Sequence, residues 1–229
     1  MDYSKNFIYF TGTDNIVLMG IGFIVGLMGF GCFQSVYSAG KILGLLMLLA
    51  GAALIYGGMK KWPVSDSDYD NSVKGYISNL KPRALNKLGV DESEVSEVPP
   101  IILGGYDFEN VERVKQGQDG KWRSNIYKVI ALFFSPHELH SYTLTFNTLR
   151  NAQNEGTDVY FYQDIVSVST SSLTVKTTVD GKEITVNNPE TFKLTTKGLA
   201  SLTVNLLDAR HVEESINAMR ALIREKKQG

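Results

Sequence analysis

Cysteine and histidine, the usual zinc ligands, are scarce in this sequence of 229 residues. Cys32 is the only cysteine, which excludes an intrachain disulfide, and three histidines add too few ligands for a typical zinc site. Lysine and arginine total 23 against 24 aspartate and glutamate, so the positive excess typical of nucleic-acid-binding proteins is missing. The G-x-S-x-G, P-loop and H-E-x-x-H motifs are also absent. We therefore predict no catalytic residue, no metal, no cofactor and no nucleic-acid partner.

Charge is nearly missing from the first quarter of the chain. Residues 1–59 carry four charged side chains, and two stretches, 16–33 and 42–59, carry none. Each stretch has 18 residues, which as a helix would be about 27 Å long, close to the hydrocarbon thickness of a bilayer. The connection 34–41 is short enough to force an antiparallel arrangement. We predict a transmembrane hairpin over residues 1–61.

Two other interpretations of the apolar stretches stay open. They could be buried helices of a soluble core, although neither keeps the polar face usual for such helices. The first stretch could instead belong to a signal peptide cleaved near Val36-Tyr37-Ser38, and whether it is retained is undecided. Against cleavage, the residues before it carry one lysine and two aspartates, whereas a secretory signal begins with a positive region.

The positive charges that flank the stretches indicate an orientation. Lys60 and Lys61 follow the second stretch directly, and further basic residues come soon after, whereas the connection holds only Lys41. The positive-inside rule then places both termini in the cytoplasm of a multi-pass cell-membrane protein. Trp62 would lie at the inner interface.

Glycine recurs at helical spacing in both apolar stretches. The segment "GIGFIVGLMGFG" (20–31) lacks the third glycine of a G-x-G-x-x-G phosphate loop, so we reject a nucleotide-binding interpretation. Small residues in a stripe let helix backbones approach closely in lipid. We expect the stripes to pack the hairpin, or to join copies of the protein into a homo-oligomer. The predicted helix-packing residues are Gly22, Gly26, Gly29, Gly44, Gly51 and Gly58.

A connector, 62–100, follows the hairpin. Apolar residues at three- and four-residue intervals predict an amphipathic helix over about 67–88, closed by Gly89. Pro82 should kink or split this helix near Lys81. The remainder, "VDESEVSEVPP", is acidic and ends in proline, as expected of a linker.

From residue 101 onward the period of the apolar pattern changes to two. We predict seven or eight mostly antiparallel strands in a sandwich or barrel, with hairpin turns at Pro136-His137 and Asp180-Gly181. The stretch 157–172 is expected to be one long strand, bent near Gln163-Asp164. An amphipathic helix over 208–227, with Asp208 as its N-cap and basic residues at its end, closes the chain. The predicted fold class is α+β.

This order of strands followed by one helix resembles the pleckstrin-homology (PH) superfold, a seven-stranded antiparallel barrel plugged by a C-terminal helix. More specifically, "VYFYQDIVSVSTSS", "ETFKLTT" and "SINAMRALIREKK" look like the bacterial PH-like or GRAM-like domains of membrane proteins. The resemblance covers about 120 residues of 101–229 and implies binding to lipid or protein without chemistry. In PH domains that bind phosphoinositides, a basic cluster lies in the first hairpin loop. The corresponding residues here are Arg113, Lys115, Lys121 and Arg123.

Aromatic residues offer a second contact surface. In a strand, Tyr160 and Tyr162 would share one face and form a partner-binding patch if exposed. We therefore expect a membrane-anchored, non-enzymatic binding or scaffold module that recognises a protein partner or lipid headgroups. The alternative is an oligomeric channel-forming or membrane-disrupting protein with the β-domain as its sensor. Against transport, no charged residue lies inside either apolar stretch.

Overall fold

The chain divides into two compact units in a computed structural model, Asp2–Ser72 and, together with Met1, Val73–Gly229. The structure describes the backbone of residues 1–35, 37–59, 64–95, 98–187, 190–198, 200–207 and 209–227, and the side chains of these residues except 13–16 and 209–211.

Several predictions concern residues outside this described part. They are the flanking charges Lys60 and Lys61, the interfacial Trp62, the cleavage-site residue Val36 and the N-cap Asp208.

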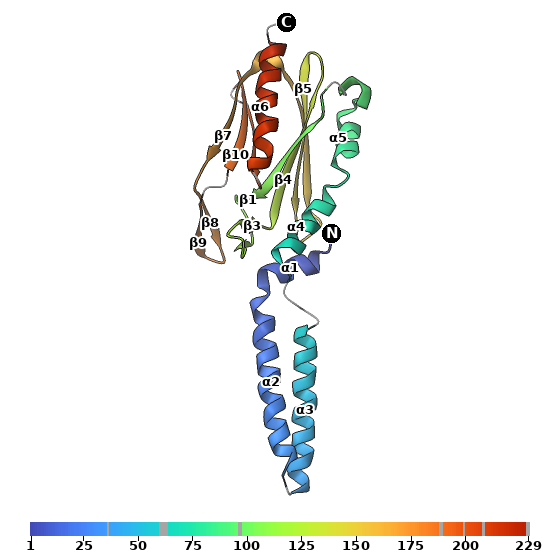
Figure 1. Ribbon diagram of the computed structural model, residues 1–229, viewed down its shortest axis with the longest axis vertical. Coiled ribbons are helices and arrows are strands. Elements are labelled where there is room, and N and C mark those ends of the chain that lie inside the picture. Colours follow the sequence, from blue (N-terminus) through green and yellow to red (C-terminus); the bar gives the residue numbers. More distant parts are fainter. Residues whose placement is uncertain are drawn as a thin grey trace. The chain divides into compact units, whose positions relative to one another are not determined.

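The first unit is helical and centres on a two-helix hairpin. Helices α2 (Thr13–Phe33) and α3 (Ser38–Met59) run antiparallel beside each other (Figure 1). Among the described residues one helix, α3, is long and apolar enough to cross a membrane, while the described apolar part of α2, Val17–Phe33, is shorter. Of the two predicted spans, α3 therefore meets the length required to cross a membrane, and the described apolar part of α2 falls short of it.

A short helix that the sequence analysis did not predict precedes the hairpin. Helix α1 (Tyr3–Thr11) is capped by Asp2, whose carboxylate accepts a hydrogen bond from the Lys5 backbone N–H at 3.0 Å. The Tyr9 ring stacks on Tyr69 with 4.4 Å between centroids, and the Tyr9 hydroxyl donates to Asp66 at 2.8 Å. Such long-range contacts hold a helix that would be marginal alone at nine residues.

The predicted helix 67–88 is two helices, α4 (Asp66–Tyr76) and α5 (Leu80–Leu88). The helix is therefore split, as expected, but the break lies at 77–79, before the predicted position near Lys81. Pro82 lies in the first turn of α5, where the N–H that proline lacks has no helical partner. Gly89 closes α5 as predicted, in the left-handed conformation at φ +68°. A short 3₁₀ helix, η1 (Glu92–Val95), follows.

The second unit contains antiparallel sheets closed by a C-terminal helix, α6 (Ala209–Lys226), and the α+β class is confirmed. One sheet has the order β1-β4-β5-β6, another has the order β11-β10-β7, and β2-β3 and β8-β9 form two-stranded ribbons. The strands are β1 (Ile101–Asp107), β2 (Val114–Gln116), β3 (Trp122–Ser124), β4 (Ile126–Phe134), β5 (Glu138–Asn147), β6 (Gln153–Phe161), β7 (Ile165–Ser172), β8 (Val175–Val179), β9 (Lys182–Val186), β10 (Glu190–Thr196) and β11 (Ser201–Leu206).

The sequence predicts a sandwich or barrel, and within the described residues strand pairing does not close a barrel. After β6, a 3₁₀ turn at Tyr162–Asp164 leads the chain out of the first sheet, and it then forms an edge of the second sheet as β7. On the other side, β1 and β11 approach each other, and the Leu207 N–H donates to the Gly104 carbonyl at 3.0 Å without a continuous ladder. The domain is therefore built from separate sheets.

The strongest turn signals are confirmed. Asp180 and Gly181 join β8 to β9 with φ of 50° and 75°, as a primed hairpin turn requires. The β4–β5 hairpin turns at the predicted residues. The single long strand expected over 157–172 is wrong, because the turn at 162–164 divides it into β6 and β7, which belong to different sheets. Strands β2 and β3 were missed, because three residues each of mostly polar composition carry no periodic pattern.

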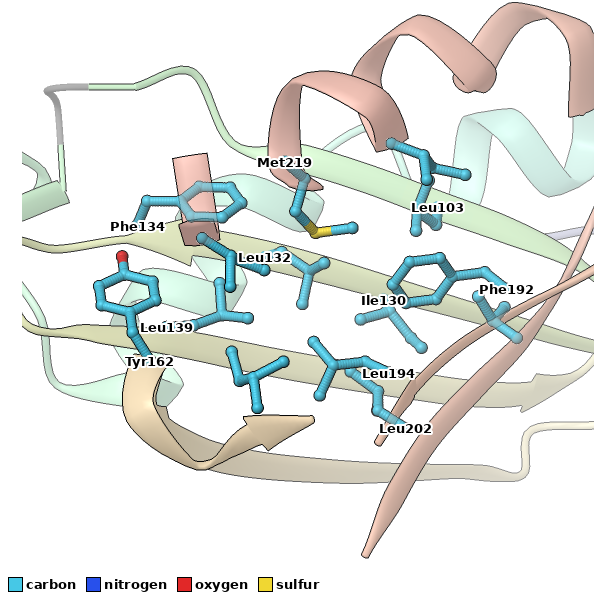
Figure 2. Packing of buried hydrophobic residues seen from close by; sticks show 14 of the residues in the cluster. Leu103, Ile130, Leu132, Phe134, Leu139, Tyr162, Phe192, Leu194, Leu202 and Met219 are labelled. Carbon is cyan, nitrogen blue, oxygen red and sulfur yellow. The ribbon is translucent and has the colours of Figure 1, made fainter. Parts of the chain in front are cut away.

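The core lies between the two larger sheets and α6 (Figure 2). It includes Leu103, Ile130 and Leu132 from the first sheet, Phe192, Leu194 and Leu202 from the second, and Met219 from α6. The opposite face of the first sheet is also buried, because the end of α4 and α5 cover it. There the Tyr76 ring lies 4.5 Å from that of Phe146, and Leu80 and Ala84 are buried.

Candidate functional site

Glycines form the contact between α2 and α3. A Cβ atom built on Gly44 would lie 2.4 Å from the Phe33 nitrogen and 2.7 Å from the Gly29 oxygen. One built on Gly51 would lie 2.7 Å from the Gly22 oxygen and 2.8 Å from the Gly26 nitrogen. The two backbones therefore touch at two levels of the hairpin, where no larger residue fits.

Other glycines of the hairpin face away from this contact. A Cβ atom built on Gly20, Gly26, Gly31 or Gly57 meets nothing within 4 Å, so these positions have open space. Gly26 thus contributes its backbone to the contact with α3, while Gly58 is buried.

The outer surface of the hairpin is made of large apolar side chains. Phe23, Leu27 and Leu49 are 61%, 58% and 61% exposed, while Gly44 and Gly51 are buried. A soluble helical hairpin has the opposite distribution, with its large apolar residues inside. Small residues within and large apolar residues outside suit an apolar solvent.

The four basic residues predicted to contact headgroups lie in or beside the β2–β3 ribbon, but they do not form an open cationic cluster. Arg123 is 1% exposed, and its guanidinium donates to both oxygens of the Asp119 carboxylate, at 2.9 and 2.8 Å. Arg113 forms an ion pair with Asp180 in the β8–β9 turn. Carboxylates therefore neutralise Arg113 and Arg123, while Lys121 is exposed and Lys115 is half-buried.

The Arg123–Asp119 pair predicts a pH dependence of stability. Hydrogen bonds from Arg123 lower the pKa of Asp119 from 3.8 to about 2. Because the folded pKa lies below the unfolded pKa, the stabilisation is complete above about pH 4 and is lost as the pH falls towards 2. We expect urea unfolding midpoints of the wild-type protein to fall more steeply between pH 4 and pH 2 than those of Asp119→Asn. Parallel curves would show that the pair contributes nothing to acid sensitivity.

The two predicted tyrosines do not share an exposed face. Tyr162 lies in the 3₁₀ turn after β6, is 2% exposed, and donates its hydroxyl to the Ser135 carbonyl at 2.7 Å (Figure 2). Tyr160 is half-buried against the core, and burial raises its pKa. The expectation of a surface patch is therefore wrong for Tyr162, because the chain turns immediately before it and directs its ring inward.

A polar cluster fastens α5 to the first sheet. Arg83 and Lys87 both form ion pairs with Glu155 on β6, Lys87 at 3.8 Å. The hydrogen bond from Arg83 lowers the pKa of Glu155, while burial raises that of the neighbouring Tyr142 to about 12. Each charged side chain of this cluster pairs with an opposite charge within the domain, so the cluster stabilises the packing of α5 on the first sheet.

Between β7 and α6 lies a groove of about 440 Å³ that the sequence analysis missed. Its polar lining is strongly basic. Arg220 and Arg224 project from α6 and Lys227 follows its last residue, and among the described residues no carboxylate lines the groove. Across the described residues, none of these three side chains has a carboxylate partner. The remaining lining residues are Ile165, Val166, Ser167, Val168 and Ile223.

Two of these cations bind the main chain of the edge strand. The Arg220 Nε donates to the Val168 carbonyl at 3.0 Å, and the Lys227 ammonium donates to the Ile165 carbonyl. The register of β7 against β10 shifts between Thr195 and Thr196, where one step along β10 matches two along β7. This bulge leaves Val166 unpaired and 60% exposed, within the groove.

The spacing of the basic residues in the sequence indicates the helix side of this groove. Arg220, Arg224 and Lys227 recur at intervals of four and three, which places them on one side of a helix. The sequence analysis explains the basic residues at the end of this helix by the helix dipole and not by a binding site. The strand that faces them cannot be recognised in the sequence, because Val168 and Arg220, which are in contact, lie 52 residues apart.

The described residues contain no group of three or more His, Cys, Asp or Glu side chains placed to hold a metal ion. Comparison with models of known protein families finds no match, and comparison with curated proteins finds none either.

Proposed function

We propose that this chain is a membrane-anchored, non-enzymatic binding module, in which a two-helix hairpin spans the bilayer and the β-domain recognises a protein partner. The observation that carries the proposal is the distribution of side chains in the hairpin. Its backbones meet through glycine, while leucine, phenylalanine and isoleucine cover its outer surface. An 18-residue part of α2 beginning at Ile16 would then form the first span, together with α3.

The order of the strands supports a PH-like assignment of the β-domain. With the two ribbons set aside, a four-stranded meander is followed by a three-stranded meander and then by a C-terminal helix. The PH superfold has this arrangement. Because domains of that superfold bind proteins or lipids, a binding role without chemistry follows from the assignment.

Two spans place both termini on one side of the membrane, and the basic residues indicate the cytoplasmic side. Lys5 precedes the hairpin, and Lys74, Lys81 and Arg83 follow it, whereas the connection carries Lys41 alone. The contacts of Gly22, Gly29, Gly44 and Gly51 lie within one hairpin. They therefore account for the glycine stripes without a second copy, which favours an anchor over an oligomeric channel.

Cysteine labelling tests the topology. In a Cys32→Ser background, Tyr37→Cys places a thiol in the connection, where the native side chain is 79% exposed. Gly156→Cys places one on β6, where a Cβ atom meets nothing within 4 Å. We expect a membrane-impermeant maleimide to label Tyr37→Cys in intact cells, and Gly156→Cys only after permeabilisation.

Other outcomes have distinct meanings. The reverse labelling pattern would refute the orientation, and equal labelling of both thiols in intact cells would refute two spans. Release of the protein by alkaline carbonate would refute the membrane anchor. Crosslinked oligomers in native membranes that Gly57→Leu dissolves would support the channel instead.

A further inference from the structure

We propose that the groove between β7 and α6 binds an acidic, extended segment of a partner protein, which pairs as an additional strand with the edge of β7. This inference rests on the proposed function and identifies the surface and the chemistry through which the β-domain recognises its partner. The residues that carry it are Arg220 and Arg224 on α6, Lys227 directly after it, and the edge carbonyls of Ile165 and Val168.

The positive charge of the groove indicates that its ligand is negatively charged. Three cations line one groove, and their partners in the described part of the chain are neutral or absent. Arg220 donates to the Val168 carbonyl and the Asn217 amide oxygen, Lys227 donates to a carbonyl, and Arg224 makes no such contact. By contrast, Arg113 and Arg123 elsewhere in the domain are each neutralised by a carboxylate. The groove is therefore complementary to carboxylates supplied from outside.

The strand determines the shape of the ligand. β7 pairs with β10 on one side only, so its other edge presents main-chain groups that can accept a further strand. Arg220 and Lys227 occupy two acceptors on that edge, the carbonyls of Val168 and Ile165. An incoming strand supplies backbone N–H groups to these carbonyls. Its carboxylates then accept the hydrogen bonds that the two cations release.

The groove floor distinguishes a peptide from a lipid headgroup. Ile165, Val166, Val168 and Ile223 supply apolar surface beside the cations, and the bulge exposes Val166 within the groove. A strand whose residues alternate can direct carboxylates towards α6 and other side chains away from it. A headgroup would use the cations but leave both the strand edge and the apolar surface without partners.

Peptide binding to the full-length protein in phosphatidylcholine nanodiscs tests the proposal. The probe is a fluorescein-labelled octapeptide of alternating Glu and Thr, followed by fluorescence anisotropy. An octapeptide of alternating Glu and Pro has the same charge, but every second residue lacks a backbone N–H and its proline rings obstruct pairing as a strand. An octapeptide of alternating Lys and Thr has the opposite charge. We expect the Glu-Thr peptide to bind, the Glu-Pro peptide to bind at least about tenfold more weakly, and the Lys-Thr peptide not to bind.

Arg224→Gln is the informative variant, because the Arg224 side chain has no hydrogen bond or ion pair with the described residues and its loss should leave the fold intact. We expect about a tenfold loss of affinity, equivalent to one charge-assisted hydrogen bond. Lys193→Gln is the matched control. It removes one exposed positive charge from β10 of the same sheet, outside the groove, and affinity should stay within about twofold.

Three results would overturn the proposal: no binding of the Glu-Thr peptide, equal binding of the Glu-Pro peptide, or equal effects of the two variants. Arg224-dependent binding of dibutyroyl phosphatidylglycerol without peptide binding would assign the groove to a headgroup instead. Failure here is separable from failure of the proposed function. If a partner is still captured stoichiometrically by Arg224→Gln, the groove is wrong but the binding role stands, whereas carbonate release refutes the anchor whatever the peptide does.

Discussion

Replacing Gly44 with leucine is expected to break the contact between α2 and α3. The first added carbon would already lie 2.4 Å from the Phe33 nitrogen and 2.7 Å from the Gly29 oxygen, and both are backbone atoms that cannot rotate away. The helices must separate, which costs about 1–3 kcal/mol by overpacking alone. We expect a lower melting temperature in detergent and a lower steady-state amount of protein in membranes.

Gly57→Leu provides the matched control for this change. Gly57 lies in the same helix, and a Cβ atom there meets nothing within 4 Å. Both variants add the same apolar side chain, so helix propensity and hydrophobicity change equally. A melting temperature of Gly44→Leu that matches that of Gly57→Leu would show that the glycine contact does not hold the hairpin together.

Replacing Gly105 with alanine is expected to separate β1 from β11. A Cβ atom there would lie 2.3 Å from the Asn205 oxygen and 2.7 Å from the carbon of the same carbonyl. The shift would also strain two hydrogen bonds, from the Asn205 amide to the Tyr106 carbonyl at 2.9 Å and from the Leu207 N–H to the Gly104 carbonyl at 3.0 Å. We expect a loss of about 2–4 kcal/mol, from overpacking and weakened hydrogen bonds, measured by urea unfolding.

Gly156→Ala makes the same change in another strand of the same sheet. A Cβ atom at Gly156 meets nothing within 4 Å, and alanine reduces the freedom of the unfolded chain. We expect its unfolding midpoint to equal or slightly exceed that of the wild type. Equal loss of stability in both variants would contradict the assigned contact between β1 and β11.

Local chemistry explains which parts of the fold could be predicted from the sequence. Asp180-Gly181 specifies a primed turn through residues that tolerate positive φ, so the β8–β9 hairpin was predicted to within a residue or two. Gly89 likewise marks the end of α5 by its left-handed conformation. Apolar patterns located β4 and β5, because β4 is a nearly continuous apolar run and β5 alternates apolar and polar residues from Tyr142 to Phe146.

Two of the failures of prediction come from long-range contacts, and one is local. Tyr162 follows the pattern of β6, but a turn held by tertiary packing sends its ring into the core. Arg123 is the local case, because the β2–β3 hairpin places Asp119, four residues earlier, against its guanidinium. The groove between α6 and β7 forms because a bulged strand packs beside the helix, and no local sequence pattern predicts that packing.

The covering of the first sheet by α4 and α5 determines where the folding domain begins. Tyr127, Tyr142 and Phe146 form a second apolar layer, and the segment from Val73 to Leu88 shields it from water. Truncating the chain at residue 101, where the strand pattern starts, would remove this cover and expose the apolar face of the first sheet to water. The segment 73–88, which the sequence analysis assigns to a connector, is thus a layer of the domain itself, and any experiment that isolates the domain must keep it.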